Sequence, residues 1–292
     1  MKQESPTFPT SVFPQTQPDQ PGIESKMNPT PISYHEDYGG TDKKLKDKVA
    51  IITGGDSGIG RAVAVCFAKE GAKVTIVHHP SEINDANEVK QMIEQGDGEC
   101  LLIQGDLTQS AFTAEVVTKV LERFGQINIL VNNAGVQYPQ SNIESITDED
   151  LHRTFAINYF ATFYLTRSVV PHLTTGDSII NTTSITAYEG NETLIDYSST
   201  KGALTSFTRS LAMNLAKKGI RVNAVAPGPI WTPLIPASFD EQKVAGFGSN
   251  TPLGRMGQPV ELAGAYLLLA SEDGSYISGA TIHVNGGTII NS

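Results

Sequence analysis

The chain has 292 residues, 39% of them hydrophobic, which is enough to bury the core of one large α/β domain or of two small ones. Its formal net charge of −10 argues against a nucleic-acid-binding surface, because a negative field repels phosphate backbones unless a basic patch overrides it. The two cysteines, Cys66 and Cys100, lie in no CxxC or metal-ligand spacing, which disfavours a disulfide framework and indicates a reducing compartment.

The start of the chain is rich in Pro, Gln, Ser and Thr and differs in texture from the rest. It has no apolar stretch after a basic end, and no later run reaches the roughly 18 apolar residues of a membrane span, so we expect a soluble cytoplasmic protein that binds no membrane. The composition predicts an extension over 1–44 and one folded domain over 45–292. The extension is compatible with a mobile tail and with a segment laid across a partner. Ile23 and Met27 are its candidates for docking.

From Lys48 onward, short apolar runs alternate with amphipathic stretches, and three of these stretches end on Gly71, Gly125 and Gly219. The alternation predicts an α/β fold: a single Rossmann-like, doubly wound domain with a seven-stranded parallel sheet flanked by helices on both faces. In such folds the ligand crevice lies beyond the carboxyl ends of the strands. The expected strands cover residues 48–54, 73–79, 100–106, 127–135, 178–184, 220–228 and 281–287.

A glycine-rich turn, TGGDSGIGRA, follows the first expected strand and leads into a helix. Gly54, Gly58 and Gly60 give it the spacing G-x-x-x-G-x-G. Backbone N–H groups in such a turn can approach a pyrophosphate, and the helix N-terminus adds partial positive charge. A tight turn with close helix packing would also require glycine, but the position between strand and helix favours a nucleotide site.

Three further strand ends fall on the same edge of the expected sheet. Asp106 can accept a hydrogen bond from an adenine amino group, the small residues of NNAG at 132–135 can lie against a cofactor, and Thr232 can hold a carboxamide. Two of these strand ends also have a simpler interpretation, since Asp106 can cap a helix and the Pro227-Gly228 bend before Thr232 can turn the chain. Their joint placement on one edge favours binding.

These motifs, followed by an asparagine, a serine, a YxxxK pair and a Pro-Gly bend, resemble the short-chain dehydrogenase/reductase (SDR) family over about five-sixths of the chain. The GGDSGIGR loop, the Pro-rich extension and the HVNGG ending resemble its branch of glucose/ribitol-dehydrogenase-like and general-stress oxidoreductases. The resemblance implies an NAD- or NADP-dependent enzyme that acts on CH–OH groups. It also implies a homotetramer packed through the helices that carry Asn158 and Tyr197.

Tyr197 and Lys201 are four residues apart, which places both side chains on one face of a helix. A phenol has a pKa near 10, and a neighbouring cation favours its ionised form. By resemblance, Tyr197 exchanges a proton with the substrate hydroxyl, Ser184 orients that oxygen, and Lys201 holds the nicotinamide ribose and lowers the tyrosine pKa. Asn158 completes the proton path. The implied reaction is hydride transfer between the nicotinamide and an alcohol or carbonyl carbon.

The preference between NAD and NADP rests on the end of the second expected strand. His78 stands where NAD enzymes usually place an acid, and His79 stands where a basic residue often follows. The position before Gly58 is Ser57, and Asp56 would repel a phosphate, so we expect NAD with dual use open. The histidines have no metal-ligand spacing, and no metal site is expected. The residues expected to bind the cofactor are Gly54, Asp56, Ser57, Gly58, Ile59, Gly60, His78, His79, Asp106, Leu107, Asn133, Ala134, Gly135, Tyr197, Lys201, Pro227, Gly228, Ile230 and Thr232.

The substrate is left open between two classes. By resemblance, substrate contacts come from residues 185–196 and 229–259. Their polar side chains suit a sugar or polyol, whereas their apolar side chains suggest a lid over a small aldehyde or ketone, although Glu189 and Asn191 can equally build a turn. The polar set is Tyr188, Glu189 and Asn191, and the apolar set is Trp231, Leu234, Ile235 and Phe239.

Other functions on the same fold remain to be weighed. A non-catalytic dinucleotide sensor or scaffold would show a broken tetrad, and all four members are present. Epimerases and dehydratases on a related fold ordinarily bring a larger C-terminal domain. Enoyl reductases usually have a longer separation between tyrosine and lysine than the four residues found here.

Overall fold

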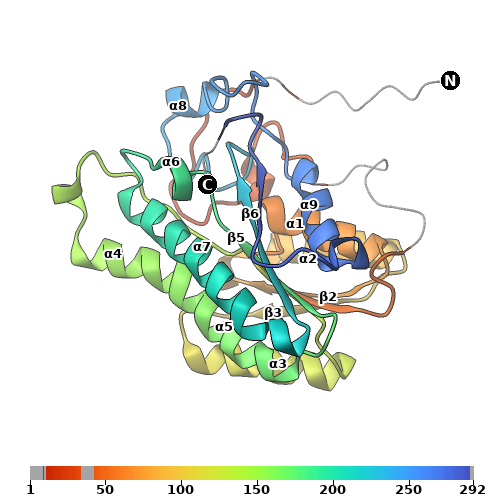
Figure 1. Cartoon of the computed structure of the whole chain (residues 1–292). Helices are drawn as coiled ribbons and strands as arrows, with labels where there is room; N and C mark the ends of the chain where they lie inside the picture. The colour runs from red at the N-terminus through yellow and green to blue at the C-terminus, as the bar shows by residue number, and fades with distance from the viewer. Residues whose placement is uncertain (1–8, 10, 34–42, 290–292) are drawn as a thin grey trace.

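Seven parallel strands form one sheet at the centre of the molecule (Figure 1). The computed structural model of the chain describes residues 9, 11–33 and 43–289. The strand order is β3-β2-β1-β4-β5-β6-β7, and every neighbouring pair is parallel. The predicted fold class and all seven expected strands are therefore confirmed. The strands are β1 (Val49–Thr53), β2 (Lys73–His78), β3 (Cys100–Gln104), β4 (Ile129–Asn132), β5 (Ser178–Thr182), β6 (Arg221–Pro227) and β7 (Thr281–Val284).

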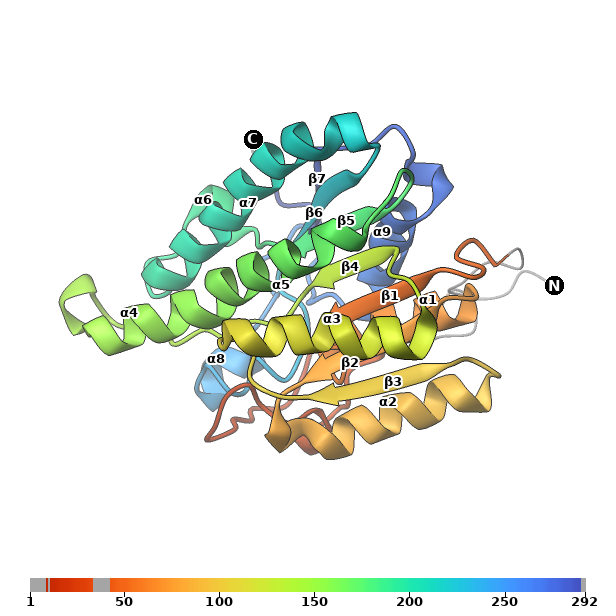
Figure 2. The same ribbon diagram turned by 90° about the horizontal axis from the view of Figure 1, so that it is seen from below.

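Helices cover both faces of the sheet, and Figure 2 shows the two layers from below. α1 (Gly58–Lys69), α2 (Ile83–Gln95) and α9 (Val260–Ala270) form one layer, and α3 (Ser110–Phe124), α5 (Ala161–Val169) and α7 (Ile195–Leu215) form the other. The remaining α-helices are α4 (Asp148–Phe155), α6 (Thr186–Glu189) and α8 (Glu241–Ala245), with a π-helical stretch over Ala156–Phe160. Short 3-10 turns cover Glu24–Lys26, Pro80–Glu82, Ile143–Ser145, Val170–His172, Ala216–Lys218 and Glu272–Gly274.

The alternation of side chains along β1 divides the core between the two layers. Ala50 and Ile52 pack into the cluster under α1 and α9, whereas Val49 and Ile51 pack into the cluster under α3, α5 and α7. Successive residues of a strand point to opposite faces, so a strand covered on both sides needs an unbroken apolar run. The run from Val49 to Ile52 is fully buried, as this arrangement requires.

The N-terminal segment, defined here as residues 11–33, lies against the chain's own folded domain. Met27 is 4% exposed and Val12 is 7% exposed, and both pack into an apolar cluster with Trp231 and Tyr197. In Figure 1 the segment runs near α8 and the top of the sheet. The boundary predicted at residue 44 stays a prediction. Among the helices of the described residues, none combines the length and apolar character needed to cross a bilayer.

Candidate active site

The glycine-rich turn closes tightly between β1 and α1. A Cβ atom on Gly60 would lie 1.9 Å from the Gly54 carbonyl oxygen, so the turn admits only glycine there. The turn is tied to the end of β4, because the Thr53 hydroxyl accepts hydrogen bonds from the backbone N–H groups of Asn133 at 2.9 Å and Ala134 at 3.0 Å. The start of α1 therefore faces the edge at which the parallel strands end, which is the place expected for a dinucleotide pyrophosphate.

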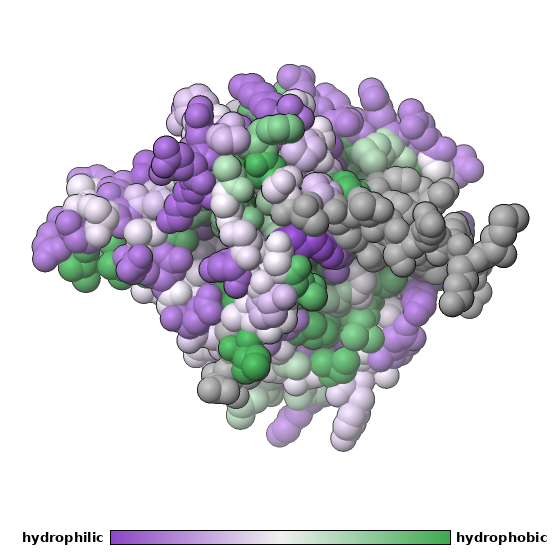
Figure 3. Space-filling view, turned by 90° about the horizontal axis from the view of Figure 1, so that it is seen from above, coloured by the Kyte–Doolittle hydropathy of each residue, from purple (hydrophilic) through white to green (hydrophobic). Residues whose placement is uncertain are grey.

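A cavity of about 1000 Å³ lies at this edge. It is lined by the glycine turn, by the ends of β2 to β6 and by the loop after β6. Of the residues predicted for catalysis or cofactor binding, Gly60 and Asn158 do not line it and all the others do. Figure 3 views this end of the molecule from above, with hydrophilic residues gathered along the top and the left of the view and hydrophobic residues gathered below its centre. The predicted residues lie at strand ends that are far apart in the sequence, and folding brings them together in one cavity.

Tyr197, Lys201 and Ser184 meet at the wall of this cavity. Tyr197 and Lys201 lie in the first two turns of α7, and the Lys201 Nζ atom is 5.5 Å from the centroid of the tyrosine ring. That Nζ donates to the Thr182 carbonyl at the end of β5 at 2.9 Å. The Ser184 hydroxyl accepts from the Thr186 backbone N–H at 3.1 Å and, beside it, forms a hydrogen bond with the tyrosine phenol. The predicted helical spacing is therefore present.

Burial controls the acidity of this pair. It raises the pKa of Tyr197 to about 12, and the hydrogen bond from Ser184 offsets only part of the rise. It lowers the pKa of Lys201 to about 8 for the same reason. This raised pKa differs from the lowered tyrosine pKa that the resemblance implies, because loss of hydration dominates at the buried phenol. The buried lysine is poised to lose its proton more readily than an exposed one.

Asn158 lies in the π-helical stretch, just behind the cavity wall, because a Cβ atom on the lining residue Gly135 would lie 3.4 Å from its Oδ1 atom. Its side chain accepts from the Val136 backbone N–H at 2.9 Å and donates to the Val136 carbonyl at 2.9 Å and to the Thr200 hydroxyl at 3.1 Å. The residue is fully buried. Its contacts fix the loop after β4 against the helix turn that carries Lys201. The proton path through Asn158 stays a prediction.

The end of β2 carries polar atoms without partners. The Nε2 atom of His78 and both carboxyl oxygens of Asp56 are buried and have no hydrogen-bond partner of good geometry among the described residues. Burial raises the pKa of Asp56 to about 6 and that of nearby Glu82 to about 8, and it lowers the pKa of His78. His79 is used differently, since its ring accepts from the Ser81 backbone N–H and begins a 3-10 turn. Unpartnered polar atoms that line a cavity fit hydroxyl groups of a bound adenosine ribose.

Two other predicted residues have structural partners. The Asp106 carboxylate accepts from the Thr108 backbone N–H at 2.9 Å and from the Thr108 hydroxyl at 2.7 Å, which is a turn after β3. Thr232 packs against the glycine turn, because a Cβ atom on Gly58 would lie 3.1 Å from its methyl group. The loop after β6 therefore folds back over the start of α1 and closes the cavity.

The substrate end contains both of the side-chain sets considered from the sequence. Glu189 and Asn191 line the cavity, and the Asn191 side chain also accepts from the Thr193 backbone N–H at 3.0 Å, which supports its interpretation as a turn former. Tyr188 packs edge-on against His283 instead and does not line the cavity. Of the apolar set, Leu234, Ile235 and Phe239 line the cavity, whereas Trp231 lies fully buried behind the wall.

Sequence reasoning missed residues that the N-terminal segment brings to the site. Gln20 and Pro21 line the cavity. Glu24 is fully buried, accepts a hydrogen bond from the Gly58 backbone N–H and pairs with Arg61 at 2.5 Å. The sequence offers only a weak signal for them, namely the apolar residues Ile23 and Met27 on either side of Glu24.

Comparison with known proteins identifies what this arrangement is similar to. A family model described as Enoyl-(Acyl carrier protein) reductase matches residues 54–288. General stress protein 39 of Bacillus subtilis is 57% identical over 97% of this chain and 98% of its own. NADPH-dependent aldehyde reductase 1, chloroplastic, of Arabidopsis thaliana is 49% identical over 95% of this chain and 98% of its own. The glucose and ribitol dehydrogenase of Daucus carota is 48% identical over 95% of this chain and 97% of its own.

Solved structures show the same fold with nicotinamide cofactors. A short chain dehydrogenase from Burkholderia cenocepacia J2315 in complex with NADP has a TM-score of 0.79 and 30% identity, over 84% of this chain and 98% of that one. A 3-ketoacyl-(acyl-carrier-protein) reductase from Brucella melitensis complexed with NADH has a TM-score of 0.75 and 34% identity, over 83% and 98%. Both cofactor types therefore occur among similar structures.

Proposed function

The chain belongs to the short-chain dehydrogenase/reductase family, and we propose that it transfers a hydride between a nicotinamide cofactor and an alcohol or carbonyl substrate. Its close relatives include general-stress and glucose/ribitol-dehydrogenase-like oxidoreductases. The observation that carries the proposal is the meeting of Ser184, Tyr197 and Lys201 in the cavity that the glycine turn opens. The bound cofactor supplies the carbon that gives or takes the hydride.

Side chains of the protein transfer the proton, orient the substrate and hold the cofactor. The Tyr197 phenol gives a proton to the substrate oxygen during reduction and takes it back during oxidation. The Ser184 hydroxyl, held at 3.0 Å by the Thr186 hydroxyl, orients that oxygen. Lys201 holds the nicotinamide ribose and passes a proton to and from Tyr197, which its lowered pKa favours. Asn158 keeps the loop after β4 in register with this helix.

The lining of the cavity favours a small polar substrate. Leu234, Ile235 and Phe239 exclude water from one side, and Glu189 offers a hydrogen bond on another. We propose a sugar, a polyol or a small aldehyde as the substrate class. The names of the plant relatives, an aldehyde reductase and a glucose and ribitol dehydrogenase, lie within these classes.

We lean to NAD, with NADP use open. Among the described residues that line the cavity at the end of β2, none is a lysine or an arginine that would pair with a ribose phosphate. The acids Asp56 and Glu82 stand there instead, and their raised pKa values leave them partly protonated near neutral pH, which softens the repulsion. The similar structures bind either cofactor, so they support a nicotinamide dinucleotide without choosing between the two.

Enoyl reduction is the activity in the description of the matching family model. The four-residue spacing of Tyr197 and Lys201 argues against it, because enoyl reductases usually separate the two residues further. A dinucleotide sensor without turnover is the other alternative, and the intact tetrad argues against it.

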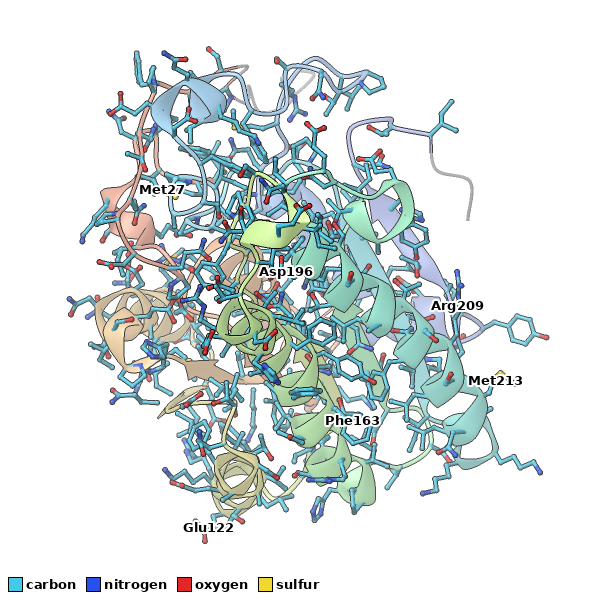
Figure 4. All side chains as sticks on the ribbon, turned by 90° about the vertical axis from the view of Figure 1, so that its left-hand side faces the viewer. Met27, Glu122, Phe163, Asp196, Arg209 and Met213 are labelled. Carbon is cyan, nitrogen blue, oxygen red and sulfur yellow. The ribbon has the colours of Figure 1, made fainter. Side chains whose placement is uncertain are left out.

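We also propose a homotetramer. The π-helical stretch, α5 and α7 present a group of contacting aromatic rings, of which Phe160 and Phe163 are each 39% exposed. Figure 4 shows Phe163 on α5 beside α7, whose two ends are marked by Asp196 and Met213. Exposed aromatic groups on long helices suit packing against a second copy.

The test is a screen of sugars, polyols, aldehydes, ketones and an enoyl thioester with both nicotinamides, followed through the absorbance of the reduced cofactor. We expect turnover with at least one alcohol or aldehyde and its loss in Tyr197→Phe. Turnover of the enoyl thioester alone would support enoyl reduction. Cofactor binding without any turnover would support the sensor.

A further inference from the structure

We propose that the N-terminal segment (residues 11–33) is a positioning element of the substrate site, in which Gln20 joins the two walls of the cavity and so sets which substrates fit. The inference rests on the proposed function, because it assigns the place where the alcohol or carbonyl substrate binds. The two walls of the cavity that Gln20 joins are the loop after β4, around Gln137, and the substrate loop, defined as residues 229–239.

Gln20 contacts both walls with one carboxamide. Its Oε1 atom accepts from the Gln137 backbone N–H at 3.0 Å, and its amide donates to the Gln137 carbonyl. The same amide lies 3.2 Å from the Ala237 carbonyl and 3.1 Å from the Ser238 hydroxyl, both on the substrate loop. The Gln137 side chain also joins the two walls directly, because it donates to the Ser238 hydroxyl at 3.1 Å. One side chain thus fixes the distance between two loops that are a hundred residues apart in the sequence.

The segment is anchored to the substrate loop on both sides of Gln20. Gln17 donates its backbone N–H to the Pro236 carbonyl at 2.5 Å. Gly22 has a φ of +76°, and a Cβ atom on it would lie 2.4 Å from the Pro233 carbonyl oxygen, so the chain passes directly over the loop there. Further on, the Trp231 indole donates to the Pro29 carbonyl at 2.7 Å. The substrate loop is therefore held along its length from outside.

The anchored loop forms the apolar wall beside the tyrosine. Met27 of the segment, labelled in Figure 4, belongs to one apolar cluster with Tyr197, Trp231, Ile235 and Phe239. Ile235 and Phe239 line the cavity, and Gln20 lines it as well. A substrate that reaches Tyr197 must fit between walls whose separation Gln20 fixes. Because the segment belongs to the same chain, the loop is held closed without a binding partner, and substrate binding need not order it first.

The first test compares Gln20→Met with Gln15→Met. Methionine keeps the length of the side chain and removes only the carboxamide. Gln15 lies in the same segment, and among the described residues its side chain bonds to Phe13 and Asn28 of that segment and to neither cavity wall, so it is a matched control. We expect KM for the substrate to rise about tenfold in Gln20→Met with the cofactor Kd within about twofold of wild type, and no change in Gln15→Met. The ratio of kcat/KM between a small aldehyde and a sugar also shifts, because the walls no longer have a fixed separation.

A merely structural role would instead lower activity toward all substrates in proportion to the folded fraction. Unchanged KM and unchanged substrate ratio in folded Gln20→Met would overturn the proposal. A parallel loss for every substrate, together with a lower melting temperature, would overturn it as well.

The second test needs no substrate, so it separates this inference from the proposed function. The chain has one tryptophan, Trp231, which is fully buried under the segment. We expect Gly22→Ala to displace the segment and raise acrylamide quenching of Trp231 at least about twofold, with a red shift of its emission. Gly190→Ala is the control for backbone strain, because Gly190 has a similar φ of +74° but an added Cβ there would meet no atom within 4 Å, and we expect it to leave the quenching unchanged. If no substrate is turned over by the wild type, the proposed function fails while the quenching still decides whether the segment holds the loop. Equal quenching in wild type and Gly22→Ala would overturn the proposal.

Discussion

Replacing Glu24 by glutamine is expected to remove a pH-dependent part of the stability of the fold. The Glu24 side chain is fully buried and lies in ion-pair contact with Arg61, at 2.5 Å, and beside the start of α1. Burial raises its pKa from 4.5 to about 7, although Arg61 and the hydrogen bond from Gly58 lower it. The neighbouring carboxyl groups of Asp85 and Asp56 add to the rise.

The sign of the effect follows from the two pKa values. Between about pH 4.5 and about pH 7, the folded chain keeps the Glu24 proton and the unfolded chain has released it, so the free energy of unfolding falls as the pH rises. The contribution is fully present below about pH 4.5 and is lost once the pH passes about 7. Each pKa unit corresponds to about 1.4 kcal/mol, so the whole loss is about 3 kcal/mol, and about 2 kcal/mol of it falls between about pH 5.5 and about pH 8.5.

The assay is urea denaturation of the wild type, Glu24→Gln and Glu88→Gln at these two pH values. The difference between wild type and Glu24→Gln cancels the titration of the other carboxyl groups, which both chains share, apart from their coupling to Glu24. We expect that difference to move by about 2 kcal/mol in favour of the variant as the pH rises. Glu88, whose side chain is 55% exposed and contacts the same Arg61 at 3.3 Å, is the control and should give a flat difference. A Glu24→Gln difference that does not change with pH would refute the burial of Glu24 against Arg61, and with it the docking of the N-terminal segment there.

Four further outcomes are expected. Tyr197→Phe should lower turnover at least about 100-fold with the cofactor Kd within about threefold of wild type, measured by steady-state kinetics and fluorescence titration; retained turnover would remove Tyr197 from the proton step. Gly60→Ala should abolish measurable cofactor binding, because the added Cβ would lie 1.9 Å from the Gly54 carbonyl oxygen, whereas normal binding would place the pyrophosphate elsewhere. His79→Arg should raise the NADP to NAD ratio of kcat/KM at least about tenfold, since an arginine can pair with the ribose phosphate, and an unchanged ratio would move the ribose site away from β2. Phe163→Asp should shift the mass measured by light scattering to a smaller species, and an unchanged mass would exclude α5 from the interface.

Local pattern was enough to predict the fold and most of the site. The strands of this sheet are continuous apolar runs because both faces are covered, and such runs can be recognised without knowing what covers them. The glycine turn and the spacing of Tyr197 and Lys201 are likewise short-range features, set by one strand-to-helix connection and one helix turn. The structure brings Ser184, Tyr197 and Lys201 to one cavity, as the sequence led us to expect, and their roles stay predictions. The comparisons confirmed the family.

What only the tertiary structure decided depends on burial and on contacts between distant residues. The pKa of Tyr197 moves upward because burial removes water from the phenol, and no spacing in the sequence measures that burial. The Asn158 side chain forms hydrogen bonds with the loop after β4 and does not line the cavity. The sequence could not show this contact, because the position of that loop depends on the packing of β4 against β5. The N-terminal segment has a composition typical of a tail, yet Gln20 and Glu24 find partners that become neighbours only after the sheet, the glycine turn and the substrate loop are assembled. The surface on which the segment docks forms only on folding, so it cannot be read from the segment itself. The sequence therefore predicted the edge of the sheet at which the cavity lies, and the structure determined which segment packs over it.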